Sequence, residues 1–79
     1  MLVTVYKRDS DANSNVVGSA VVTKTGVHYI IGEDEIKDIT VNSLRTRDLL
    51  GEDFDENNLE HWNMLPKFYS GSMYWVTIT

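Results

Sequence analysis

The chain contains no cysteine and only one proline, and its longest unbroken apolar run is the four residues 73–76. The lack of cysteine excludes disulfides and thiolate metal sites, and it fits a reducing compartment. Four apolar residues are far fewer than the roughly twenty that a helix needs to span a bilayer. Lys7 and Arg8 follow the first apolar residues, the reverse of the order in a signal peptide. We therefore expect one domain, residues 1–79, in the cytoplasm.

Catalytic fingerprints are also missing. His28 and His61 are the only imidazole bases, and no serine lies in a G-x-S-x-G turn. The five glycines are isolated from one another, so no phosphate-binding loop is present. The sequence therefore predicts a protein without enzymatic activity or a cofactor, in which both histidines have structural or surface roles.

Calcium binding is the one metal function that the spacing of carboxylates suggests. Two segments repeat the pattern D-x-D-x-N, one beginning at Asp9 and the other at Asp53. An EF-hand loop also needs glycine at its sixth position and glutamate at its twelfth. Those positions hold Ser14 and Ala20 in the first segment, and Asn58 and Met64 in the second. We therefore expect no metal site, and interpret the segments as a hairpin loop and a helix start.

Eight aromatic residues raise the question of a stacking surface for single-stranded nucleic acid, with Tyr29, Tyr74 and Trp75 as candidates. Such binding draws on phosphate neutralisation by lysine and arginine, yet seven bases stand against twelve acids. We expect most of the aromatic side chains to pack in the core, and no direct binding of nucleic acid.

Strand-forming residues dominate the first half of the chain. Residues 2–7, 16–23, 27–31 and 36–41 are rich in β-branched and aromatic side chains, which favour strands. A polar loop at 9–15 and a tight turn at 24–26 separate the first three. In the third strand, alternation predicts Val27, Tyr29 and Ile31 on one face and His28 and Ile30 on the other.

Helical patterns replace the strand pattern after Asn42. A first helix over 42–50 would begin at Asn42 or Ser43 and carry leucines at 44, 49 and 50, with Gly51 at its end. A second would begin at Asp53 and end before Pro66. Residues 73–79 then read as a returning strand. The order β-β-β-β-α-α-β predicts an α+β fold, an antiparallel sheet of about five strands with one or two short helices on one face.

Charge is strongly asymmetric along the chain, whose net charge is −5. Residues 33–60 hold ten of the twelve carboxylates and three bases, a balance of −7, whereas the remainder sums to +2. The acids form a first acidic cluster at residues 32–38 and a second acidic cluster at 48–60. Acidic turns and helix starts are usually just solvated, but a face of one sign also selects a basic partner.

The leading hypothesis is a small acidic binding protein that docks on a basic, nucleic-acid-handling protein and blocks it. In size, charge and lack of catalytic residues the chain is similar to small inhibitors encoded by phages or mobile elements. The expected partner-binding residues are Glu33, Asp34, Glu35, Asp38, Glu52, Asp53, Phe54, Asp55, Glu56, Glu60 and Trp62.

Two other functions stay open at this point. One is a structural or assembly component, a monomer or small homo-oligomer, that pairs through edge strands at 2–7 or 73–79. The other is an enzyme in which Asp53 and Asp55 hold a divalent metal. Nothing in the sequence suggests a membrane partner.

Overall fold

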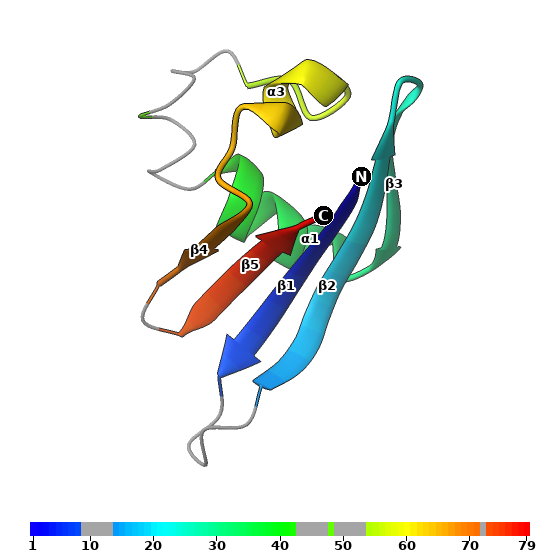
Figure 1. Cartoon of the computed structure of the whole chain (residues 1–79). Coiled ribbons are helices and arrows are strands. Elements are labelled where there is room, and N and C mark those ends of the chain that lie inside the picture. Colours follow the sequence, from blue (N-terminus) through cyan, green and yellow to red (C-terminus); the bar gives the residue numbers. More distant parts are fainter. Residues whose placement is uncertain (9–13, 43–47, 49–53, 72) are drawn as a thin grey trace.

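The computed structural model of the chain contains one antiparallel sheet of five strands, in the order β3-β2-β1-β5-β4 (Figure 1). It describes residues 1–8, 14–42, 48, 54–71 and 73–79. The strands are β1 (Leu2–Arg8), β2 (Ser14–Thr23), β3 (Gly26–Ile31), β4 (Phe68–Ser70) and β5 (Tyr74–Ile78). The helical elements are α1 (Glu33–Ile36), η1 (Lys37–Val41) and α3 (Leu59–Asn63). The predicted α+β class is therefore confirmed.

Four of the predicted strands are present with small changes at their ends, namely β1, β2, β3 and β5. The turn between β2 and β3 consists of Lys24 and Thr25, and Thr23 pairs with Gly26 across it. Gly26 has a φ of 126°, a conformation that side chains rarely adopt. The predicted tight hairpin is therefore confirmed.

The strand predicted at 36–41 is wrong, because these residues continue a helix that starts at Glu33. Gly32 adopts a left-handed conformation with φ 64° and turns the chain out of β3. The first turn of this helix contains three acids, whose negative charges interact favourably with the positive end of the helix dipole. The helix continues as the wider η1, in which the Asn42 N–H donates to the Lys37 carbonyl at 2.7 Å. Burial of Ile36 outweighs the strand propensity of these residues.

The described part of the second predicted helix begins later than expected. α3 starts at Leu59, and its cap is Asn58, whose side-chain oxygen accepts the Glu60 N–H at 3.0 Å. The predicted cap at Asp53 lies outside the described residues, and so do the leucines and Gly51 of the helix predicted at 42–50. The three-residue strand β4 follows Pro66 and was not predicted.

The expected edge strands are also wrong. β1 pairs with both β2 and β5, and β5 pairs with both β1 and β4, so both lie inside the sheet. The edges are β3 and β4. One edge is partly closed, since the Val27 N–H of β3 donates to the Asn57 side chain at 3.3 Å.

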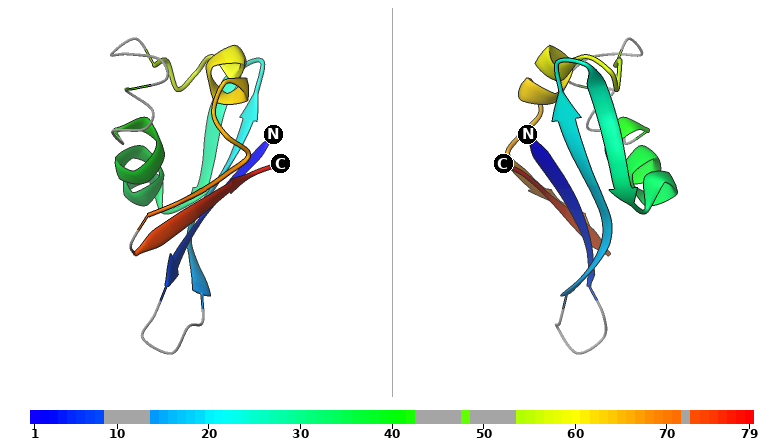
Figure 2. Two further views of the ribbon diagram at one scale, coloured as in Figure 1. Left: turned by 60° about the vertical axis from the view of Figure 1, so that its left-hand side comes forward. Right: turned by 90° about the vertical axis from the view of Figure 1, so that its right-hand side faces the viewer.

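The helices lie on one face of the sheet and enclose the core against it (Figure 2). Gly18 on β2 lets Ile36 approach closely, because a Cβ there would lie 3.1 Å from the Ile36 side chain. None of the helices in the described part of the chain has the length and apolar composition needed to cross a bilayer. The buried apolar residues are Val3, Val5, Ala20, Val22, Ile36, Trp62, Leu65, Val76 and Ile78.

A β-bulge changes the predicted alternation in β3. Tyr29 pairs with Ala20, but the next pair is Ile31 with Ser19, so Ile30 is an extra residue. Val27 and Tyr29 pack against the core as predicted, whereas Ile31 is half exposed, at 50%. The prediction that Ile31 shares their face is therefore wrong.

Candidate functional site

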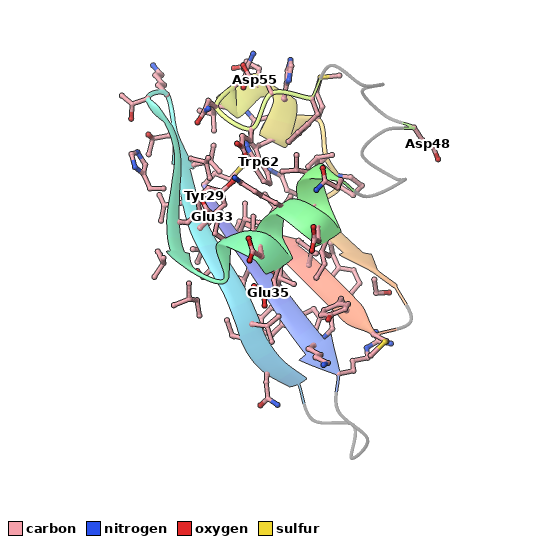
Figure 3. All side chains as sticks on the ribbon, turned by 180° about the vertical axis from the view of Figure 1, so that it is seen from behind. Tyr29, Glu33, Glu35, Asp48, Asp55 and Trp62 are labelled. Carbon is pink, nitrogen blue, oxygen red and sulfur yellow. The ribbon has the colours of Figure 1, made fainter. Side chains whose placement is uncertain are left out.

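Carboxylates are separated from the sheet in this fold. None of the five strands contains aspartate or glutamate. Glu52 and Asp53, two of the predicted partner-binding residues, lie outside the described residues. Figure 3 views the molecule from the helix side and shows Glu33 and Glu35 on α1, Asp55 near α3, and Asp48 well apart from them. The candidate site is therefore the helix-covered side, without Asp48.

The first acidic cluster is displayed by α1 and η1. Ile36 and Thr40 are buried and fix the inner side of this helix, and the Thr40 hydroxyl donates to the Ile36 carbonyl. Asp34 and Asp38 are exposed and lie four residues apart, a spacing at which like charges repel on a helix. This part of the surface therefore carries unneutralised negative charge.

Glu33 takes part in the one ion pair found among the described residues. Its Oε1 lies 3.8 Å from the Lys37 Nζ, with both side chains substantially exposed. Exposed pairs of this kind contribute about 0.3–0.5 kcal/mol. Lys37 also lies over the Tyr29 ring, 5.7 Å from its centroid. One lysine therefore offsets only part of the charge of this cluster.

The described part of the second acidic cluster is organised by its own polar side chains. The Asp55 carboxylate accepts the Asn57 N–H at 3.0 Å, which closes an Asx turn. The Asp55 N–H donates to Nδ1 of His61 at 2.9 Å. His61 therefore holds the loop in place, whereas His28 is exposed and lies 3.4 Å from the Thr25 hydroxyl.

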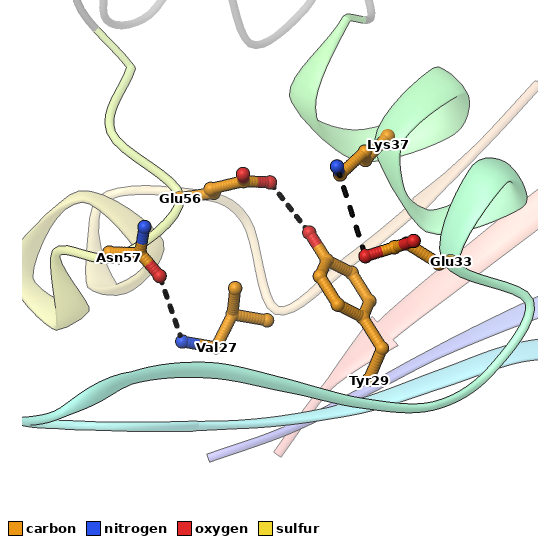
Figure 4. Close-up of polar contacts among 6 residues, drawn as sticks. All are labelled: Val27, Tyr29, Glu33, Lys37, Glu56 and Asn57. Carbon is orange, nitrogen blue, oxygen red and sulfur yellow. Dashed lines mark hydrogen bonds and ion pairs between the residues drawn. The ribbon is translucent and has the colours of Figure 1, made fainter.

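Tyr29 brings the two clusters together (Figure 4). Its hydroxyl donates to the Glu56 carboxylate at 2.6 Å, which ties the 54–58 segment to β3. Burial, the hydrogen bond to Glu56 and the nearby charges of Glu56 and Glu33 raise the pKa of Tyr29 well above its ordinary value. Glu33 pairs with Lys37, which lies over the Tyr29 ring, and Tyr29 bonds Glu56, so the two clusters meet at Tyr29. Neither Tyr29 nor Asn57 was predicted as a site residue.

Replacing Tyr29 with phenylalanine is expected to lower the free energy of unfolding by about 1–2 kcal/mol at neutral pH, because the Glu56 hydrogen bond is lost. In the wild type the folded state disfavours the phenolate. The stabilisation that comes from the raised Tyr29 pKa is therefore fully present below the unfolded pKa of about 10, and it decreases as the pH rises above that value. The variant lacks this component, so it should lose less stability between about pH 8 and pH 11 in urea unfolding. An equal loss in both proteins would contradict this role for Tyr29.

The two apolar residues predicted as partner anchors have different positions. Trp62 is fully buried, with its indole N–H donating to the Glu56 carbonyl at 2.8 Å, so it contacts no partner in this fold. Its assignment as a surface anchor is a misreading of a core residue. Phe54 is half-buried and packs edge-on against Trp62, with 5.2 Å between ring centroids. Of these two residues, only Phe54 keeps a partly accessible apolar surface beside the acids.

Metal ligation finds no support in the described residues, among which no three histidines or carboxylates are grouped to hold an ion. Of the two segments with calcium-like spacing, Asp9, Asp11, Asn13 and Asp53 lie outside that description. Comparisons with known proteins find no family model, no curated protein and no solved structure that matches this chain.

Proposed function

We propose that this chain is a small non-enzymatic binding protein whose acidic, helix-covered side docks on a basic surface of a nucleic-acid-handling protein and blocks it. The observation that supports the proposal is the meeting of the two acidic clusters at Tyr29, which bonds Glu56 and lies under Lys37, the partner of Glu33. Clusters separate in sequence thereby contribute to one side of the fold. The cysteine-free chain suits an encounter in the cytoplasm.

The docking surface consists of the described carboxylates around this junction. In the complex they would occupy positions that nucleic acid phosphates otherwise take on the partner. Opposite charge speeds association and makes it sensitive to salt, while the half-buried Phe54 supplies apolar contact. The carboxylates are Glu33, Asp34, Glu35, Asp38, Asp55, Glu56 and Glu60.

The partner is identified with the chain as bait in host lysate, at about 0.05 M and about 0.5 M salt, followed by mass spectrometry. A basic nucleic-acid-handling protein should be retained at low salt and released at high salt. In a second assay the captured partner is first bound to a labelled oligonucleotide. Addition of the chain should then release the oligonucleotide. Retention of acidic or structural proteins alone would contradict the proposal.

Charge reversal at Asp34 and Asp38 tests the surface itself. The D34K/D38K variant is expected to bind the captured partner about 10–100-fold more weakly, mainly through slower association. Both side chains are exposed on the helix, so the fold should remain intact. Asp48→Lys is the single-charge control, to be compared with Asp34→Lys, because Asp48 is exposed and lies apart from this side (Figure 3). Equal affinity of D34K and D48K would argue that position on the surface is irrelevant.

A further inference from the structure

The second face of the sheet lies opposite the helices and takes no part in the proposed acidic docking surface. We call it the open face, because no element of the described chain packs on it. The pairing register places Leu2 beside Val21, Tyr6 beside Trp75, and Phe68 beside Thr77 on this face. Their sequence neighbours Val3, Val5 and Val76 point the other way into the core.

The open face carries several exposed apolar side chains among polar ones. Leu2 is 41% exposed, Ile31 50% and Phe68 56%, and Val16, which pairs with Tyr6, is 46% exposed. Antiparallel sheets with one wet face usually alternate core residues with polar ones. The register also places Ser19, Thr4 and Thr77 in a polar row across the middle of this face, with apolar side chains around it. Exposed apolar side chains in this number still favour an interaction site.

The aromatic side chains on the open face pack against one another, and this arrangement is poorly suited to stacking nucleic acid bases. Tyr6 and Trp75 stack on each other, with 3.8 Å between ring centroids and 8° between planes. Phe68 contacts Trp75 from β4, with a centroid distance of 5.8 Å. The ring of Trp75 therefore has an aromatic neighbour on each side, whereas a stacking platform offers a ring face to the base.

We propose that the open face binds the open face of a second copy of this chain. Charge is the argument for this occupant. Each copy has a net charge of −5, yet no strand carries a carboxylate. Face-to-face packing therefore puts the acidic helix sides of both copies on the outside of the dimer. Sheets pack about 10 Å apart, so two layers of helix and sheet separate the acidic sides by several Debye lengths at physiological salt.

The size of the sheet is compatible with this occupant. The strands have lengths of 7, 10, 6, 3 and 5 residues. With a rise of about 3.3 Å per residue and a spacing of about 4.8 Å, they cover roughly 500 Å² of flat sheet. Side chains make the accessible area larger than the flat area. The flat area is below the ~800 Å² per partner of a standard interface, so we expect a weak, reversible dimer.

Sedimentation equilibrium of the whole chain over a range of concentrations tests this proposal. We expect the mass to rise with concentration from 9.0 kDa toward twice that value. Leu2→Lys and Ile31→Lys are each expected to raise the dimer dissociation constant about tenfold or more, because each places a charge in an apolar interface. Met64→Lys is the matched control, since Met64 is 59% exposed and lies beside α3. It should leave the dissociation constant unchanged.

Three outcomes would overturn the dimer. The first is a monomer at every concentration. The second is a dimer that both face variants leave intact, which would point to edge pairing. The third is a dimer that dissociates as salt is raised. Salt screens the repulsion between two acidic copies, so the proposed dimer should become tighter at high salt. This proposal does not depend on the acidic surface, because D34K/D38K should dimerise like the wild type.

Discussion

Replacing Trp62 with alanine is expected to remove most of the chain's free energy of unfolding. The indole is fully buried, packs against Phe54 and donates a hydrogen bond to the Glu56 carbonyl. Removing a buried tryptophan costs about 3–5 kcal/mol, and the whole stability of a domain is about 5–15 kcal/mol. A chain of 79 residues belongs toward the lower end of that range. Urea unfolding followed by circular dichroism measures the loss.

Trp62→Phe provides the graded comparison. It keeps a ring beside Phe54 but removes the indole N–H, which leaves the Glu56 carbonyl without that partner. We expect a loss of about 1–3 kcal/mol, smaller than for alanine. If Trp62→Ala instead melted like the wild type and lost only partner binding, Trp62 would be a surface anchor, as the sequence suggested.

The strands were predictable where local pattern and tertiary structure agree. β1 and β5 are rich in β-branched and aromatic residues and supply Val3, Val5, Val76 and Ile78 to the core, and Lys24 and Thr25 form the tight turn between β2 and β3. Their positions within the sheet were not predictable, because strand order depends on contacts between distant segments. Nothing local to β1 indicates that β2 and β5 flank it on both sides.

Residues 36–41 show how tertiary contacts override propensity. Ile36, Ile39, Thr40 and Val41 are β-branched, and alone they favour a strand. Gly32 turns the chain back across the sheet, and Ile36 then enters the space left by Gly18. The three acids after Gly32 favour a helix start, but the sequence alone does not show that this preference outweighs four β-branched residues.

The candidate site was predictable in its charge but not in its geometry. The composition of residues 33–60 identified the acids themselves. Their meeting point is Tyr29, a strand residue that no charge pattern marks, and it depends on Glu56 reaching it across 27 residues. Trp62 was misassigned for a related reason, since a tryptophan among acids fits both a core position and a binding position.

Gly32→Ala is expected to destabilise the fold by about 2–5 kcal/mol. The left-handed conformation alone costs about 1–2 kcal/mol for a residue with a Cβ, and close contact adds about 1–3 kcal/mol. At Gly32 the φ is +64°, and a Cβ would clash with the Val17 carbonyl oxygen and lie 2.8 Å from the Gly18 Cα. Both contacts are with backbone, which cannot rotate away as a side chain can. The midpoint of urea unfolding measures the change.

Gly71→Ala is the matched control, because the nearest atom to a Cβ there is the Tyr74 carbonyl oxygen at 3.8 Å. It should change stability by about 0.5 kcal/mol or less. Equal stability of the two variants would mean that the turn at Gly32 is not fixed. In that case the position of the first acidic cluster relative to Tyr29 would not be fixed either, because Gly32 is the residue that joins α1 to β3.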